Sequence, residues 1–429
     1  MEVPPSELTA LKRRFDAMKI GFGGGDYSLL IGPPFMISQR EFERLQGFGR
    51  LYAQLFNTVN RLYLDSVKQL KQPGKRSTVL KLLEGGLDDR AVWYQHRLYE
   101  GKPVRLPVFM RADMLSLDRT VELNIPGSGL GWMDSMDGYA PGRRNFGCGL
   151  ARGWAEGLKR LTGKERPRVA LPLYSEDVRN ELNHFAGALS AMGVETLVYG
   201  RDLPDPAKVD VIVRFSMNYM TSRPGWNEIW DAYMAGKLEI EPPPTSIYDT
   251  KIPFYLPFFS ETRSAFPDAM RELFPRTWLV EPEGKIPLII GGVEKEVDVE
   301  RIPDLPGKER ELVIKYAGSK SALGGGGRAV FQLDGSREGA RKLIQQALRD
   351  LRLEEDPWVI QERLKKYFDV EYLTPEGGLS TARMHARIMP YYRLQEGQVV
   401  VDGGSVLFSE NWKVHGAHKS VHCPIRVTE

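Results

Sequence analysis

A run of four glycines between two hydrophobic segments constrains the fold of this 429-residue chain more than any other feature. The stretch LVIKYAGSKSALGGGGRAVFQL predicts a strand with Lys315 near its end, then a loop, then a returning strand. Because Gly324, Gly325, Gly326 and Gly327 have no Cβ, their N–H groups can approach phosphate oxygens closely, and the lysine supplies a fixed positive charge. There is no GK[ST] and no helix follows directly, so this is neither a Walker A loop nor a Rossmann fingerprint. The pattern favours a flap over a nucleotide, and the alternative is a flexible surface hairpin.

A second hydrophobic segment follows about one helix later. PWVIQERL is typical of a buried strand, and it ends in Gln361 and Glu362. In a nucleotide site such a strand end can offer backbone groups to the adenine edge and a carboxylate to the amino group or ribose. The alternative is an ordinary core strand with a solvent-facing tip.

The segment RADMLSLDRTVELN predicts a hairpin that gathers oxygen ligands. Arg111 and Asp113 are two residues apart on one strand, hence on one face, and the same holds for Glu122 and Asn124 on the returning strand. Two carboxylates and an amide oxygen suit Mg²⁺ that is also held by substrate phosphates. An arginine beside them would neutralise charge on a transferring phosphoryl group. The alternative is a hairpin face held by ion pairs of Arg111 with Asp113 or Glu122.

Composition narrows the class of partner. The formal net charge is only +3, with basic and acidic residues interleaved, which argues against a nucleic-acid-binding protein. No stretch approaches the ~20 apolar residues of a membrane span, and the first residues have no apolar core of a secretory signal. The two cysteines, Cys148 and Cys423, form no metal-type spacing. We therefore expect a cytoplasmic protein with reduced thiols and no membrane association.

The chain divides into three regions in this interpretation. Residues 1–105 are mostly helical, with an apolar helical face from Ser38 to about Leu83. Residues 106–250 hold the hairpin and then alternate strand, helix and strand, as in a small parallel α/β domain. Residues 251–429 follow a proline-rich connection and hold the lysine strand, the glycine loop, a helix over 338–351 and the PWVIQERL strand.

Together these segments resemble the circularly permuted ATP-grasp proteins, including the synthetase domain of the glutathionylspermidine synthase type. LFPRTWLV precedes the lysine strand, and ELVIKYAGSKSALGGGGRAV and PWVIQERL follow in that order. The R-x-D…E-x-N hairpin lies before all of them, and this early position is the mark of permutation. RPRVALPLYSEDVRNELNHFAGALSAMGVETLVYG looks like the preATP-grasp subdomain of the same group.

The resemblance implies an α/β, ATP-grasp-like, circularly permuted fold with a preATP-grasp-like subdomain and an N-terminal helical segment. It implies an ATP- and Mg²⁺-dependent ligase that joins a small-molecule or peptide carboxylate to an amine through an acyl-phosphate.

Two alternatives stay open, a phosphotransferase on the same scaffold and a nucleotide-binding protein without turnover. Substrates, oligomeric state and the roles of five further basic residues also stay open: Arg143, Arg144, Arg383, His385 and Arg387. By the same resemblance the site residues are Lys315, Gly324, Gly325, Gly326, Gly327, Gln361 and Glu362 for ATP, Asp113, Glu122 and Asn124 for Mg²⁺, and Arg111 for the γ-phosphate or acyl-phosphate.

Overall fold

A long amphipathic helix underlies most of the molecule. The computed structural model describes residues 5–18, 30–70, 77–101, 104–125, 129–137, 144–320, 329–354, 356–395, 397–414 and 420–428. Helix α2 (Gln39–Gln69) begins at a capping box, in which Ser38 and Glu41 each accept a hydrogen bond from the other's backbone N–H. The expected apolar face is buried, so this part of the helical prediction is confirmed. The other helices of this part of the chain are α1 (Pro5–Met18), α3 (Thr78–Glu84) and α4 (Asp89–Gly101).

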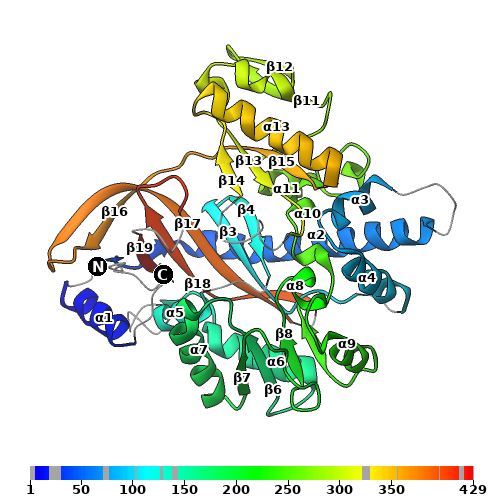
Figure 1. Ribbon diagram of the computed structural model, residues 1–429. Coiled ribbons are helices and arrows are strands. Elements are labelled where there is room, and N and C mark those ends of the chain that lie inside the picture. Colours follow the sequence, from blue (N-terminus) through cyan, green and yellow to red (C-terminus); the bar gives the residue numbers. More distant parts are fainter. Residues whose placement is uncertain are drawn as a thin grey trace.

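The largest sheet is mixed and draws strands from both ends of the chain (Figure 1). Its described strands are β1 (Leu30–Ile31), β2 (Phe35–Ile37), β3 (Phe109–Ser116), β4 (Arg119–Asn124), β5 (Arg144–Asn145), β16 (Phe368–Leu373), β17 (Leu379–Gln395), β18 (Gln398–Ser409) and β19 (Val421–Val427). The main path runs β16-β1-β19-β18-β17-β3-β4, with β2 and β5 added at β19. Since β16 also pairs with β17, five of these strands close into a ring, and the β3–β4 hairpin extends from it.

A parallel sheet with flanking helices forms the α/β unit, here defined as residues 150–241. Its strand order is β7-β6-β8-β9, all parallel, as the alternating sequence pattern predicts. The helix of the expected strand–helix–strand pattern is present as a short 3₁₀ turn, Glu176–Val178, followed by an α-helix. The elements are β6 (Arg168–Pro172), β7 (Glu195–Tyr199), β8 (Val211–Val213), β9 (Glu239–Glu241), α6 (Leu150–Thr162), α7 (Arg179–Ala191), α8 (Met217–Thr221) and α9 (Trp226–Met234).

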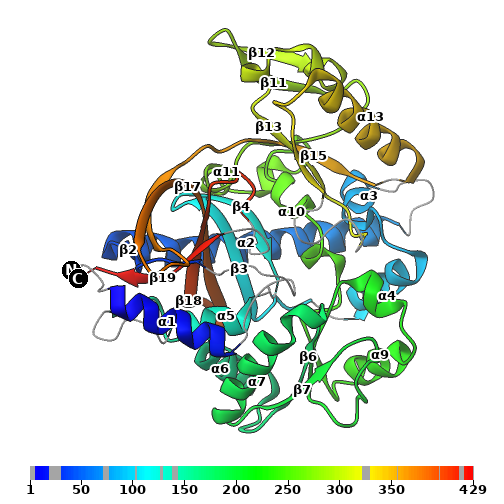
Figure 2. The ribbon, with the colours of Figure 1, turned by 60° about the vertical axis from the view of Figure 1, so that its left-hand side comes forward.

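The strand that carries Lys315 lies in a separate antiparallel sheet, which we call the lysine sheet. Its order is β10-β15-β13-β14, and helix α13 packs on one side of it, with the β11–β12 arm beyond (Figure 2). The predicted strands on both sides of the glycine loop, the helix and the PWVIQERL strand are all present. The elements are β10 (Thr277–Leu279), β11 (Lys285–Ile290), β12 (Val293–Asp298), β13 (Leu312–Tyr316), β14 (Val330–Gln332), α13 (Arg337–Glu354) and β15 (Trp358–Glu362), with α5 (Leu130–Asp137), α10 (Ile252–Tyr255) and α11 (Asp268–Leu273) elsewhere.

Strand β3 is covered on both faces because its side chains alternate between two cores. Met110, Ala112 and Met114 belong to the core that α2 covers. On the other face Phe109 stacks on Trp154 of α6, with ring centroids 4.0 Å apart. Arg111 and Asp113 share the face of Phe109, so the hydrophobic packing beneath them fixes the direction in which both side chains point.

None of the described helices combines the length and the apolar character that a membrane crossing demands. Cys148 and Cys423 are both free thiols.

Candidate active site

The β3–β4 hairpin brings the four polar residues together, as the sequence predicts. Asp113 pairs with Glu122 and Arg111 with Asn124 in the strand register. Side chains directly opposite each other in an antiparallel pair lie on the same face with Cβ atoms about 5 Å apart. The convergence of these side chains is therefore confirmed, whereas their roles stay predictions.

The Asp113 carboxylate accepts hydrogen bonds from three protein side chains. Arg111 donates to it from Nε at 2.8 Å and from Nη2 at 3.2 Å, and Asn124 Nδ2 donates at 2.8 Å. Arg387 of β17 donates to the same carboxylate. Burial alone would raise the pKa of Asp113, but Arg111 and Arg387 outweigh it and lower the pKa below its usual value. Asp113 is thus a permanent anion held by two arginines, and the ion-pair alternative for Arg111 is present in the structure.

Lys315 reaches from the lysine sheet to the hairpin. Its ammonium donates to Gln361 Oε1 at 2.6 Å and to the carbonyl oxygen of Val121 at 3.4 Å. Gln361 is in turn fixed by a bond from its Nε2 to Thr277 Oγ1 at 3.0 Å. Only 7% of Lys315 is exposed, and desolvation lowers its pKa to about 8. The hydrogen-bond partners of this buried ammonium are a neutral amide and a carbonyl. An anion bound beside it would therefore stabilise its charged form.

A second lysine completes this cluster, and the sequence reasoning missed it. Lys251 Nζ lies 3.3 Å from Glu122 Oε1, and the backbone N–H of Lys251 donates to the carbonyl of Ala317, just after β13. Thr250 also donates to the Ala317 carbonyl through its hydroxyl. No spacing rule singles out Lys251, because it reaches the site only when the start of α10 packs on the end of β13.

The remaining predicted residues lie in the site, at its border or outside the described residues. Glu362 Oε1 accepts a hydrogen bond from Arg276 Nε at 2.7 Å and lies at the border. Arg383 and His385 both contact the ring of Tyr367, whereas Arg387 donates to Asp113 and belongs to the site. Gly324, Gly325, Gly326, Gly327 and Arg143, and the side chain of Arg144, lie outside the described residues.

The hairpin offers Mg²⁺ only a small set of oxygen donors. No group of three or more His, Cys, Asp or Glu in the described part of the chain is arranged to hold a metal ion. Asp113 is bonded to two arginines. Glu122 is half-buried and pairs with Lys251. The side-chain nitrogen of Asn124 donates a hydrogen bond to Asp113. The side-chain oxygen of Asn124 is therefore the atom that suits a cation. Mg²⁺ usually takes one or two protein oxygens plus phosphates and water, and Glu122 and Asn124 fit that requirement.

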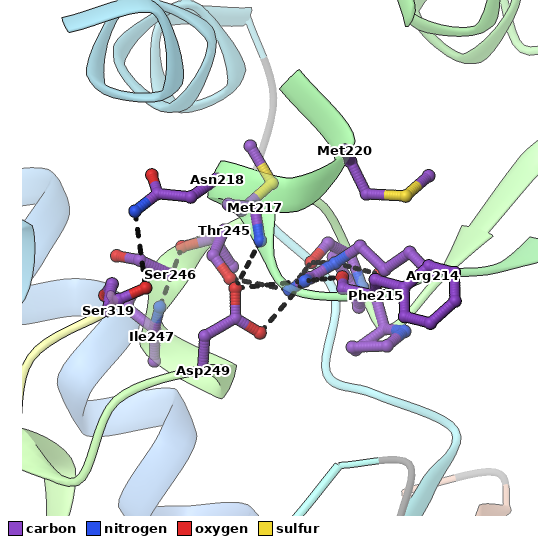
Figure 3. Close-up of polar contacts among 12 residues, drawn as sticks. Arg214, Phe215, Met217, Asn218, Met220, Thr245, Ser246, Ile247, Asp249 and Ser319 are labelled. Carbon is purple, nitrogen blue, oxygen red and sulfur yellow. Dashed lines mark hydrogen bonds and ion pairs between the residues drawn. The ribbon is translucent and has the colours of Figure 1, made fainter. Parts of the chain in front are cut away.

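A buried arginine, Arg214, joins the α/β unit to the segment 242–249, which directly precedes Thr250 and Lys251 (Figure 3). Arg214 follows β8, and its three guanidinium nitrogens donate to four different carbonyls and to the Asp249 carboxylate at 2.9 Å. Asn218 of α8 donates to the carbonyls of Gly86 and Ser319. Ser319 lies three residues after the end of β13. The end of β13 is therefore held in place by contacts from three distant parts of the chain.

Comparison with known proteins supports the fold. No family model matches the sequence, and neither does any curated protein. Among solved structures, a glutathione synthetase-like effector (GSS30) from Globodera pallida, in its apo form, superposes with a TM-score of 0.56. The match covers 100% of this chain and 98% of that chain at 13% sequence identity. The described part of the chain therefore has a mixed α/β fold similar to that of this effector.

Proposed function

We propose that this protein is an ATP-dependent carboxylate–amine ligase with a circularly permuted ATP-grasp fold. The observation that carries the proposal is the meeting of Lys315 with the hairpin of Asp113 and Glu122, about two hundred residues earlier in the chain. Basic, amide and carboxylate groups from the lysine sheet, the large sheet and α10 converge at this one place. The glutathione synthetase-like fold of the neighbour supports the same class of chemistry.

In the proposed reaction the substrate carboxylate oxygen attacks the γ-phosphorus, and ADP leaves. The amine nitrogen then attacks the acyl carbon of the acyl-phosphate, phosphate leaves and the nitrogen loses a proton. Lys315 and Lys251 bind and orient the phosphates, and Arg111 and Arg387 hold the acid and the transferred phosphoryl group beside each other. Asp113 keeps the two arginine side chains in position.

Glu122 and Asn124 would hold Mg²⁺, which supplies charge neutralisation on the phosphates when bound. Gln361 and Glu362 are proposed to border the adenine. The Gly324–Gly327 run, outside the described residues, is proposed to cover the phosphates, and this proposal rests on its sequence alone. The enzyme must exclude water, since an acyl-phosphate is readily hydrolysed.

A phosphate-release screen with Mg-ATP and pooled carboxylates and amines, followed by mass spectrometry, tests the proposal. We expect ADP, phosphate and an amide product, all lost in Lys315→Met. A phosphorylated product without an amide would identify a phosphotransferase and refute the ligase.

One observation favours a second candidate, a nucleotide-binding protein without turnover. Asp113, predicted as a metal ligand, is already held by two arginines and an amide, which compete with a cation for its oxygens. The named neighbour is also called an effector rather than an enzyme. Mg-ATP binding by calorimetry without ADP formation in the screen would establish this candidate.

A further inference from the structure

A groove runs along α13, at a distance from the candidate active site. It has a volume of about 480 Å³ and is lined by residues of α13 and of the 3₁₀ turn Val299–Asp304. This volume falls in the range of roughly 300–1,000 Å³ that is usual for ligand sites. In both views α13 stands at the end of the molecule opposite the α/β unit (Figure 1, Figure 2). The groove shares none of its lining residues with the site around Lys315 and the hairpin.

The groove follows the helical repeat of α13. Residues four apart on a helix lie next to each other on its surface, and the lining residues form two such neighbouring rows. One row holds Ile344, Leu348 and Arg352, and the other holds Arg341, Arg349 and Leu353. From the first to the last of these residues the rows span about 18 Å of helix axis, at about 1.5 Å per residue. A surface of this length and spacing matches one face of a second, short helix.

The floor of the groove is apolar, and an apolar side chain at its end is open to solvent. Pro303, Ile344 and Leu348 are buried, and the last two belong to the core beneath the lysine sheet. Leu353 is 75% exposed, the highest value among the large apolar side chains of the described residues. A single exposed leucine is ordinary on a protein surface, but this one continues a groove with an apolar floor. The end of the groove therefore offers a partner apolar surface to bury.

The rim of the groove is basic. Its lining includes three arginines and one acidic residue, Glu300, so it carries a formal excess of two positive charges. Arg341 pairs with Asp304 at 2.8 Å, and Arg352 pairs with Glu300 at 4.0 Å. All four of these side chains are more than half exposed. Such exposed pairs contribute little stability, so both arginines can exchange their partner for a carboxylate of a ligand.

The third arginine, Arg349, forms no ion pair within the part of the chain that the structure describes. It donates a hydrogen bond to the neutral side chain of Gln346. The adjacent Asp350 is engaged elsewhere, because it accepts from Trp358 Nε1 of the lysine sheet at 3.0 Å. Arg349 lies one helical turn before Leu353, so a positive charge and an exposed apolar side chain lie next to each other.

We propose that this groove docks an acidic amphipathic helix of a partner protein. The apolar side chains of that helix, three or four residues apart, cover Leu353 and the groove floor. Its Asp and Glu side chains pair with the arginines of the rim. A second copy of this chain fits less well, because a symmetric contact would bring the arginines of two grooves together. A bilayer fits less well because a flat surface leaves the floor of a groove unfilled.

Selection from a display library of random peptides on the full-length chain tests this inference. The peptides have about 16 residues, enough to cover the groove as a helix. We expect the selected peptides to combine Asp and Glu with Leu, Ile or Phe at three- and four-residue spacing. A selected peptide, labelled with a fluorophore, is then titrated with wild type and variants by anisotropy. Arg349→Glu should weaken its binding at least about tenfold, and Leu353→Ala about five- to tenfold.

A matched control separates the groove from net charge. Lys208→Glu makes the same change of charge at a side chain of the α/β unit that is 79% exposed, and it should leave the affinity unchanged. Since Arg349 and Leu353 are both exposed, their variants should melt within a few degrees of wild type.

Four results would overturn the inference. One is selected peptides without acidic residues, or no selection at all, and another is equal affinity of wild type and Arg349→Glu for the peptide. Vesicles of phosphatidylcholine and phosphatidylserine are a second probe. Binding to these vesicles that is lost in Arg349→Glu, without peptide binding, would assign the groove to a membrane surface. A wild-type dimer in light scattering that dissociates in Arg349→Glu would assign it to a second copy of the chain.

Discussion

Binding of Mg-ATP should be coupled to protonation of Lys315. Burial lowers the pKa of this lysine to about 8. In the protein without ATP, the Lys315 side chain therefore begins to lose its proton just above neutral pH. About 90% of the side chain is protonated at pH 7 and about 10% at pH 9. An ATP phosphate beside the ammonium would restore the pKa to its ordinary range or above. Affinity should therefore fall about tenfold from pH 7 to pH 9, with uptake of about 0.9 proton per ATP at pH 9.

The same shift affects stability in a defined direction. The folded-state pKa lies below the ordinary 10.5, so between pH 8 and 10.5 the unfolded chain binds more protons than the folded one. The free energy of unfolding of the apo protein should therefore rise with pH across this window, by about 3 kcal/mol as an upper figure. Lys315→Met removes the titrating group and should abolish the rise.

Calorimetric titrations at pH 7, 8 and 9, in buffers with different ionisation enthalpies, measure both affinity and proton uptake. Lys315→Met is the matched control, since it keeps the length of the side chain and cannot take up a proton. A wild-type affinity that is flat from pH 7 to 9, without proton uptake, would refute the reasoning. Uptake that persists in Lys315→Met would assign the proton to a different group.

Three further predictions concern the hairpin and the packing beneath it. Glu122→Gln should abolish ATP turnover or shift its magnesium dependence, measured by ADP release, and should cost only about 0–1 kcal/mol because its ion pair is partly exposed. Asp113→Asn should cost about 3–5 kcal/mol in denaturant unfolding, since it leaves buried arginines without their anion. In the wild type the arginines lower the pKa of Asp113 in the folded state. The stability that Asp113 contributes is therefore present above pH 3.8 and is lost as the pH falls further. Gly153→Ala should lower the melting temperature, since its Cβ would lie 2.1 Å from the Asp402 carboxylate, whereas Gly187→Ala, in open space, should not.

The hairpin could be predicted in detail because alternation along a strand is a local property. R-x-D and E-x-N each place two side chains on one face, and a turn of a few residues leaves little choice of register. The meeting of Lys315 with this hairpin followed from the motif order and not from any local pattern. The contact of Lys315 with Gln361 could not be predicted, because the end of the PWVIQERL strand favours a place for Gln361 at the adenine edge.

Contacts made by isolated residues could not be predicted. Lys251 and Arg387 show no spacing that separates them from other surface cations, and their roles depend on the packing of α10 and of β17. The pairing of β1 with β19 was equally hidden, since two residues carry no period.

The closed ring of the large sheet also sets the order in which the chain can fold. Helix α2 packs on β17 and β18, but β17 begins roughly 310 residues after α2 ends. At about 5–20 residues per second, ribosomal synthesis delays that cover by about 15–60 seconds. During this interval the side of α2 that carries Leu45, Gly49 and Tyr52 lacks the strands that cover it. We therefore expect newly made chains to depend on chaperones at α2, and to acquire a protease-resistant sheet only after β19 joins β1.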